Sequence, residues 1–178
     1  MTKSSTDAFM RAGISYVPSD RNHVATVSSF RLFDNWPLRR VLKRPFLAYR
    51  SIKKETEQAI RDYDVRVSDK DAVSENLSGG NLQKFILGRE ISKNPEVLIC
   101  SNPTRGIDVK ASWAIRNRII EAKDMGMTVV ISSGDFEELF YMSDRILVMY
   151  KGKIFAETTP KDSTVNRLGS MMMGVMPE

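Results

Sequence analysis

The sequence predicts an α/β fold with a mostly parallel sheet and an additional helical subdomain. Two short apolar runs, at residues 97–100 and 127–131, have the length and continuous hydrophobicity of strands covered on both faces. Between them, four apolar residues recur at helical spacing: Ala111, Ile115, Ile119 and Ala122. This alternation of strand and helix is typical of a parallel α/β layer.

Shorter elements are expected before this layer. Residues 13–18, GISYVP, predict a short strand that ends at a proline. Residues 52–63 have helical character. A second helix is expected directly after Ser78-Gly79-Gly80, because Leu82 and Phe85 share one face of it with Ile86.

The region after residue 131 predicts a helix, a hairpin and a terminal helix. Phe136 and Phe140 indicate a short helix, and residues 146–150 a strand. Lys151-Gly152 predicts a hairpin turn into residues 154–156. Residues 159–173 are expected to be helical, and their three consecutive methionines fit packing better than metal binding.

Length and composition indicate one globular domain, or a compact core with an attached subdomain, in a chain of 178 residues. No apolar run approaches the roughly 20 residues that cross a bilayer, and the polar start has no core like that of a secretory signal. We therefore expect a cytoplasmic protein. The single cysteine, Cys100, cannot form an internal disulfide, which fits a reducing compartment.

Positive charge is concentrated between residues 35 and 54. This segment holds seven Lys or Arg residues and no acid, whereas the whole chain has a net charge of +5. Trp36, Phe46 and Tyr49 lie among the charges, and Pro37 and Pro45 interrupt any single long helix. We expect an irregular, exposed subdomain. Its basic side chains fit phosphate-bearing partners or a membrane surface, and they equally fit a solvated helical face.

Ser78-Gly79-Gly80 is the first segment with specific chemistry. Glycines let backbone N–H groups approach a ligand closely, and a helix N-terminus favours negative charge. The serine hydroxyl can donate to a phosphate or cap the helix. Taken alone, the three residues fit an ordinary glycine turn and helix cap better than a phosphate contact.

Three segments together resemble the ABC transporter ATP-binding family: LSGGNLQK at 77–84, PEVLICSNPTRGID at 95–108 and MSDRILVMYKG at 142–152. Their order and spacing match the family, and the likeness covers residues 13–156. Within this family, the three segments are most similar to the second nucleotide-binding half of the ATP-binding subunits of sugar and nucleoside importers. The resemblance implies one partial nucleotide-binding domain over residues 1–178. Its expected parts are a Q-loop strand and connection at 13–34, a helical subdomain with the signature loop at 35–94, core strands and helices at 95–158, and a C-terminal tail or helix at 159–178.

The resemblance also implies roles for individual residues. The signature loop corresponds to Ser78, Gly79, Gly80 and Asn81, and in this family it reaches the γ-phosphate of ATP held by the other half of a head-to-tail dimer. Asp108 corresponds to the D-loop carboxylate at the same interface, and Ser19 occupies the Q-loop position. ATP and Mg²⁺ would be bound at this shared site, and we expect neither to be bound by this chain alone. A permease membrane subunit is the other expected partner, and the basic segment would face it.

The expected catalytic positions depart from the family pattern. The strand-end Asp that positions Mg²⁺ and the group that activates water fall on Ser101 and Asn102. A serine hydroxyl is neutral, and an asparagine can orient water but cannot accept its proton near neutral pH. Losing a positioned base costs roughly 10² to 10⁴ in rate. The family's switch histidine falls on Gly134, or on Ser133 if the match shifts by one residue, and neither can replace an imidazole. The sole histidine, His23, fits a surface residue better than a substitute.

A further departure is the missing phosphate-binding motif. No Gly-x-x-x-x-Gly-Lys-Ser/Thr occurs in the sequence, so the Walker A strand and helix of a P-loop NTPase are absent from the predicted fold. The resemblance places them upstream of Met1, and it implies that the sheet lacks its middle strand.

Three functional hypotheses follow. The chain is expected to be a non-hydrolysing ATP-binding part of an ABC importer for sugars or nucleosides, lying on the inner face of the membrane and completing a partner's ATP site. The alternatives are a scaffold or regulatory pseudo-ATPase, or a truncated remnant. Nucleic-acid binding through the basic segment is not expected, because LSGGNLQK is typical of sugar importers.

Overall fold

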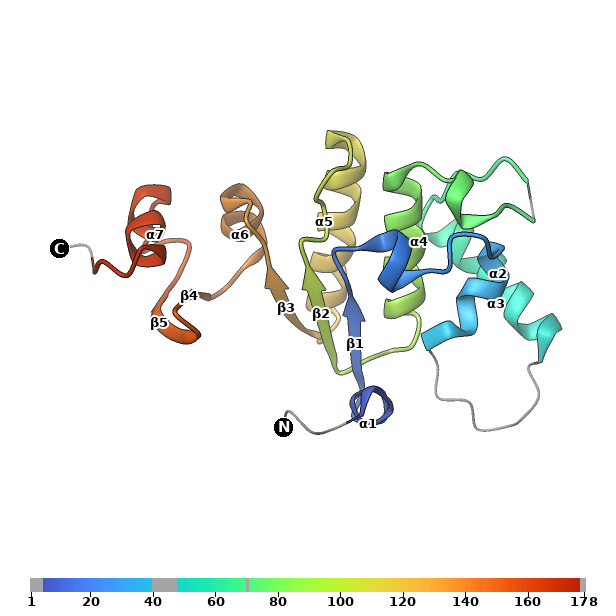
Figure 1. Cartoon of the computed structure of the whole chain (residues 1–178), viewed down its shortest axis with the longest axis horizontal. Coiled ribbons are helices and arrows are strands. Elements are labelled where there is room, and N and C mark those ends of the chain that lie inside the picture. The colour runs from blue at the N-terminus through green and yellow to red at the C-terminus, as the bar shows by residue number, and fades with distance from the viewer. Residues whose placement is uncertain (1–4, 40–47, 70, 177–178) are drawn as a thin grey trace. The chain divides into compact units, whose positions relative to one another are not determined.

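The computed structural model describes residues 5–39, 48–69 and 71–176 (Figure 1). The predicted basic segment is therefore described only in part, and Pro45 and Phe46 lie outside the described residues. The chain forms two compact units, Met1–Ser132 and Ser133–Glu178. No helix within the described ranges is long and apolar enough to cross a membrane.

The first unit is built around a three-stranded parallel sheet in the order β1-β2-β3 (Figure 1). Its elements are α1 (Thr6–Arg11), β1 (Ile14–Val17), the π-helix η1 (Arg21–Ala25), α2 (Leu32–Asn35), the 3-10 helix η2 (Trp36–Arg39), α3 (Tyr49–Asp62), the 3-10 helix η3 (Ser74–Asn76), α4 (Gly79–Ile91), β2 (Val97–Ser101), α5 (Val109–Asp124) and β3 (Thr128–Ser132). The predicted α/β fold with a parallel sheet is confirmed.

The two faces of the sheet differ in burial. Val17, Leu98 and Cys100 are fully buried on one face, where α4 contacts β1 and α5 contacts β3. On the other face Ile99 is half-buried, and Val130 of β3 is 51% exposed. The expectation that these strands are covered on both faces is therefore wrong for the described residues. A continuous apolar run indicates that both faces of a strand are hydrophobic, but it does not show that other elements cover both faces.

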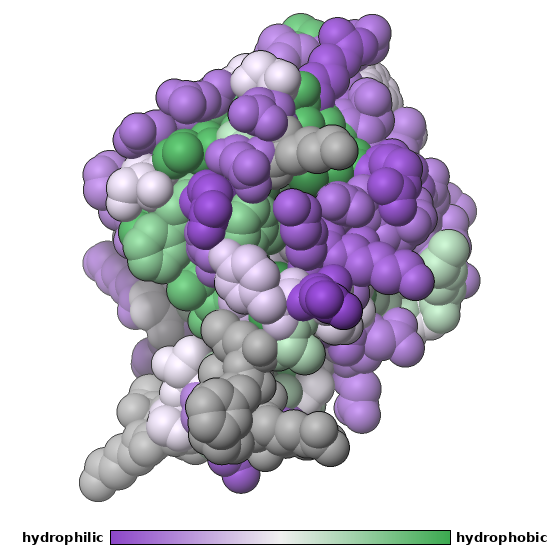
Figure 2. Space-filling model, turned by 90° about the vertical axis from the view of Figure 1, so that its right-hand side faces the viewer, coloured by the Kyte–Doolittle hydropathy of each residue, from purple (hydrophilic) through white to green (hydrophobic). Residues whose placement is uncertain are grey.

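The helical part of the first unit has its own buried core. Trp36 is 1% exposed, its ring centroid lies 5.7 Å from that of Phe85, and its Nε1 donates to Glu55 at 3.3 Å. The expectation of an exposed subdomain is thus wrong for Trp36, because α4 supplies an aromatic partner for its indole. Figure 2 shows the side that carries α2 and α3, where hydrophobic surface lies among hydrophilic side chains. Among the described residues between 24 and 49, the large exposed apolar side chains are those of Val24, Val27, Phe30, Leu38 and Tyr49.

The second unit contains a hairpin between two helices. Its elements are α6 (Phe136–Met142), β4 (Ile146–Tyr150), β5 (Lys153–Thr158) and α7 (Val165–Met172). The strands pair antiparallel, and the predicted turn residues Lys151 and Gly152 both have positive φ, 45° and 76°. Leu168 and Met171 of α7 pack with Ile146 and Val148 of β4.

The C-terminal helix is shorter than the predicted range of 159–173. Thr164 caps its start by accepting from the backbone N–H of Arg167 at 3.2 Å. Of the three methionines, Met171 is buried in the core, whereas Met172 and Met173 are exposed. The packing role expected for all three therefore holds only for Met171.

Candidate functional site

Two of the predicted catalytic positions lie at the carboxyl ends of the parallel strands. Ser101 ends β2 and pairs in register with Ser132, which ends β3. The N–H of Asn102 then donates to the carbonyl of Ser132 at 2.7 Å, so the ladder continues for one residue. Asn102 has a φ of +45°, a conformation that asparagine tolerates better than most residues. The chain therefore leaves the sheet in a tight turn at this edge, where open α/β sheets bind ligands.

The side chains at this edge do not fit a dedicated Mg²⁺ site. Mg²⁺ in phosphoryl-transfer sites is held by one or two carboxylates together with substrate phosphates. Ser101 and Asn102, both half-buried, offer neutral oxygens instead. Across residues 5–39, 48–69 and 71–176, no three His, Cys, Asp or Glu residues gather where they could hold a metal ion.

The predicted signature loop forms the start of α4. Ser78 has extended backbone geometry and caps the helix, since its Oγ accepts from the backbone N–H of Asn81 at 3.4 Å and from Asn81 Nδ2 at 3.0 Å. The Asn81 side chain also accepts from the N–H of Arg66 at 3.0 Å. The helix-cap interpretation of Ser78 is therefore confirmed.

Capping leaves Ser78 able to donate. A serine hydroxyl has two acceptor lone pairs and one O–H donor, and the two contacts from Asn81 use only the lone pairs. The first N–H groups of a helix have no partner inside it and carry partial positive charge. Ser78 and Gly79 are exposed, so this end of α4 presents the donors that fit an anionic group such as phosphate.

Gly80 brings the signature loop and Asp108 together. A Cβ at Gly80 would lie 2.7 Å from Ala111 Cβ and 3.4 Å from Asp108 Oδ2. Asp108 itself caps α5, because its Oδ1 accepts from the N–H of Ala111 at 2.9 Å. The two segments predicted to share one interface therefore lie in contact at the N-terminal ends of α4 and α5.

The remaining predicted positions are on other segments of the chain. Ser19 is exposed just after β1. His23 is exposed, and its Nδ1 lies 3.2 Å from Asp20, which fits the surface interpretation. Gly134 is exposed at the start of the second unit, where a Cβ would meet nothing within 4 Å.

Sequence reasoning did not identify Arg21. Its Nη1 donates to the carbonyl of Gly79 at 3.1 Å, and its Nη2 donates to the carbonyl of Arg105. Burial lowers the pKa of this guanidinium. The only signal in the sequence is a cation two residues after Ser19, which carries no information about the distant loops that it contacts.

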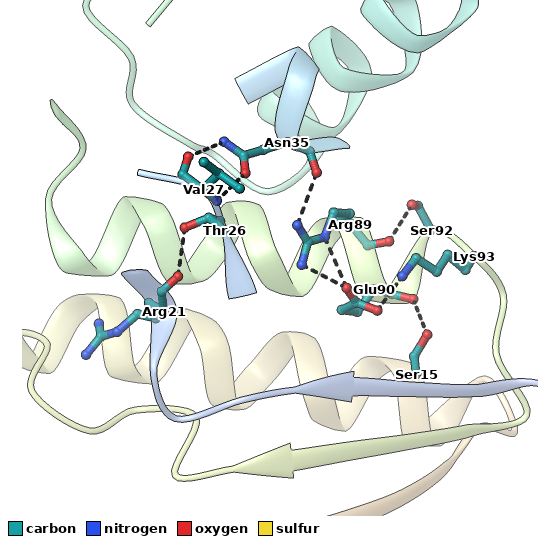
Figure 3. A network of polar contacts seen from close by, with 9 residues as sticks. All are labelled: Ser15, Arg21, Thr26, Val27, Asn35, Arg89, Glu90, Ser92 and Lys93. Atoms are coloured by element: carbon teal, nitrogen blue, oxygen red, sulfur yellow. Dashed lines mark hydrogen bonds and ion pairs between the residues drawn. The ribbon is translucent and has the colours of Figure 1, made fainter. Parts of the chain in front are cut away.

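A buried polar network involves the C-terminal half of α4 (Figure 3). Arg89 and Glu90 of α4 form an ion pair at 3.0 Å with almost no exposure. Arg89 also donates to the carbonyl of Asn35 at 3.1 Å, and the Asn35 side chain bonds both backbone groups of Val27. The network therefore ties the C-terminal half of α4 to the segment that follows η1.

Comparison with curated proteins finds close relatives among import ATP-binding proteins. The chain is 39% identical over 181 residues to the glucose import ATP-binding protein TsgD13 of Haloferax volcanii, covering 98% of this chain and 33% of the relative. It is 38% identical to the guanosine import ATP-binding protein NupO of Bacillus subtilis, covering 92% of this chain and 33% of that relative. The chain thus spans about a third of the length of these proteins. No protein-family model matches it.

Solved structures share the fold. The dimeric ATP-binding cassette MJ0796 bound to ADP and Pi matches with a TM-score of 0.71 at 19% identity, covering 86% of this chain and 66% of the cassette. cbiO1 from Clostridium perfringens, part of an ABC transporter complex, matches with a TM-score of 0.68 at 22% identity, covering 93% of this chain and 63% of that one. With the relatives and the arrangement of Ser78 to Gly80 beside Asp108, these matches confirm the predicted resemblance. The chain belongs to the ABC transporter ATP-binding family.

Proposed function

We propose that this chain is part of the ATP-binding subunit of an ABC importer for sugars or nucleosides, and that it completes the ATP site of a partner domain without hydrolysing ATP itself. The names of the relatives support the importer class, since they include glucose, guanosine and ribose import ATP-binding proteins. The partner would be a P-loop ABC ATPase domain arranged head to tail with this chain.

One contrast within the first unit carries this proposal. The donors at the start of α4 are intact and adjoin Asp108, whereas the strand end that should carry carboxylates has Ser101 and Asn102. A helix N-terminus stabilises a nearby anion by about 0.3–1 kcal/mol, and by up to ~2 kcal/mol when partly buried. Loss of the general base costs roughly 10² to 10⁴ in rate. The chain is thus suited to help bind a phosphate and poorly suited to drive its hydrolysis.

The surroundings of the chain are part of the same proposal. The two units would be parts of one nucleotide-binding domain, held on the cytoplasmic face of the membrane by a permease subunit. Exposed apolar residues such as Val27, Phe30 and Leu38 lie where the basic segment begins, and they support a protein contact on that side. Ser19 at the Q-loop position and Gly134 at the switch position would complete the inert half-site.

Cross-linking to the partner tests the placement of the signature loop. In a Cys100→Ala background, Val109→Cys puts a thiol next to Asp108 on a side chain that is 74% exposed. We expect a short bifunctional thiol reagent to join it, in the presence of ATP, to a cysteine placed in the P-loop of the partner domain from the same importer. Met125→Cys, 86% exposed at the opposite end of α5, is the matched control and should not react with that cysteine. Equal cross-linking from both positions would contradict the proposal.

A second candidate function is a scaffold that assembles with the permease without using nucleotide. This function is favoured by the neutral residues at the Q-loop, strand-end and switch positions, which are Ser19, Ser101, Asn102 and Gly134. Co-purification with the permease subunit in the absence of ATP is the expected result. Strict dependence of that assembly on ATP would argue against the scaffold.

A further inference from the structure

Arg21 connects two loops that are far apart in sequence. Its guanidinium donates to the carbonyl of Gly79, 58 residues away, and to that of Arg105, 84 residues away. Gly79 belongs to the signature loop, and Arg105 lies three residues before Asp108. One side chain therefore bridges the two segments that the proposed function places at a shared ATP site.

The backbone of Arg21 is fixed at the start of η1. The Asp20 side chain caps this π-helix by accepting from the N–H groups of Asn22 at 3.1 Å and His23 at 3.0 Å. The carbonyl of Arg21 accepts from the buried Thr26, from its N–H at 3.1 Å and its Oγ1 at 2.7 Å (Figure 3). Because the backbone on both sides of Arg21 is held by these hydrogen bonds, its side chain can keep the two loops at a fixed spacing.

Two glycines make room for the guanidinium. A Cβ at Gly79 would lie 3.1 Å from Arg21 Nη1, and a Cβ at Gly106 would lie 3.5 Å from Nη2. Gly106 also has a φ of +67°, a conformation that disfavours other residues. Both loops therefore leave space for the guanidinium of Arg21. This space suits the planar set of donors that arginine has and lysine lacks.

We propose that Arg21 is a positioning residue that sets the spacing between the signature loop and the loop carrying Asp108. It acts through the carbonyls of Gly79 and Arg105, to which its guanidinium donates. The consequence for ATP turnover rests on the proposed function, whereas the effect on the two loops is a property of this chain alone.

Amide hydrogen exchange of the full chain tests the effect on the loops. In Arg21→Ala we expect exchange at residues 81–82 and 111–112, whose amides bond to Ser78 and Asp108, to rise about tenfold or more, because opening of these loops is no longer opposed by the bridge. Arg21→Lys keeps the charge but not the fork, so we expect an intermediate value. Arg145→Ala, which removes an exposed ion pair with Glu157 in the second unit, should leave both loops unchanged. Unchanged exchange in Arg21→Ala would overturn the proposal, and so would a uniform rise across β2 and α5, which indicates general destabilisation.

ATPase kinetics with the P-loop partner separate this inference from the proposed function. We expect Arg21→Ala to lower kcat for ATP by roughly 10²-fold, the size of effect that a displacement of about 1 Å in a positioned group produces. KM should change little, because the partner's P-loop holds the nucleotide. If the wild-type chain does not stimulate its partner, the proposed function fails while the exchange experiment still decides the role of Arg21. Stimulation by the wild type that Arg21→Ala retains in full would overturn the role of Arg21 alone.

Discussion

Gly80 and Ala111 lie in such close contact that a Cβ at position 80 would be 2.7 Å from the Cβ of Ala111. This distance is shorter than real Cβ contacts, so the N-terminal ends of α4 and α5 can approach each other only because residue 80 is glycine. The contact places the signature loop beside Asp108, which caps α5. A packing constraint thereby fixes the distance between two groups assigned to the same interface.

Gly80→Ala should destabilise the first unit. Overpacking of this kind costs about 1–3 kcal/mol, and here the obstacle is another Cβ that cannot rotate away. Gly169→Ala in α7 is the control, since a Cβ there meets nothing within 4 Å and replaces a helical glycine. Urea denaturation followed by circular dichroism should show a lower midpoint for the first variant only. An unchanged midpoint for Gly80→Ala would show that α4 and α5 separate without cost.

Asn102 should be replaceable by glycine more readily than by alanine. Both substitutions remove the amide, so their difference isolates the backbone, whose φ is +45°. Alanine disfavours that conformation, and we expect Asn102→Ala to be less stable than Asn102→Gly by about 1 kcal/mol. The comparison is made from urea unfolding curves at one temperature. If Asn102→Ala proved more stable than Asn102→Gly, the left-handed conformation assigned to residue 102 would be wrong.

The buried pair Arg89–Glu90 should be sensitive to loss of one partner. Arg89→Leu leaves Glu90 with Lys93 but removes the bond to the Asn35 carbonyl, and breaking a buried pair typically costs about 3–5 kcal/mol. Arg11→Ala removes an exposed ion pair with Asp7 and should leave the unfolding midpoint nearly unchanged. Equal midpoints for the two variants would mean that the network in Figure 3 contributes little.

The ion pair between the exposed Asp64 and the largely buried Lys84 predicts a small acid dependence of stability. A hydrogen bond from Lys84 lowers the pKa of Asp64 below its usual 3.8, so the folded state holds the charged form more tightly than the unfolded state does. The stabilisation is present above pH 3.8 and is lost as the pH falls through the lower folded value. Wild type and Lys84→Met should therefore differ less in unfolding free energy at pH 3 than at pH 6. A difference that grows on acidification would contradict this sign.

The local features of the fold were predictable because their signals are short. Ser78-Gly79-Gly80 before an apolar face predicted the start of α4 to within two residues, and the hydrophobic run predicted β2. Lys151-Gly152 gave the hairpin turn for the same reason, since positive φ is a property of the turn residues themselves.

Contacts between distant segments were not predictable from those signals. Trp36 was expected in an exposed segment, yet Phe85, 49 positions later, helps to bury it. The bridges made by Arg21 join loops 58 and 84 residues away, and periodicity carries no information on such pairs. Coverage of the sheet was likewise overestimated, because Val130 is apolar but 51% exposed.

Ser78→Arg tests the central proposal, that this chain donates its signature loop to a partner's ATP site. The measurement is the ATPase rate of the P-loop partner domain of the same importer, mixed with wild-type chain, with Ser78→Arg, or with Ser68→Arg as an exposed control that should remain active. We expect the wild type and Ser68→Arg to stimulate hydrolysis, and we expect Ser78→Arg to return the rate to that of the partner alone while circular dichroism shows it folded. Undiminished stimulation by Ser78→Arg would contradict the proposal.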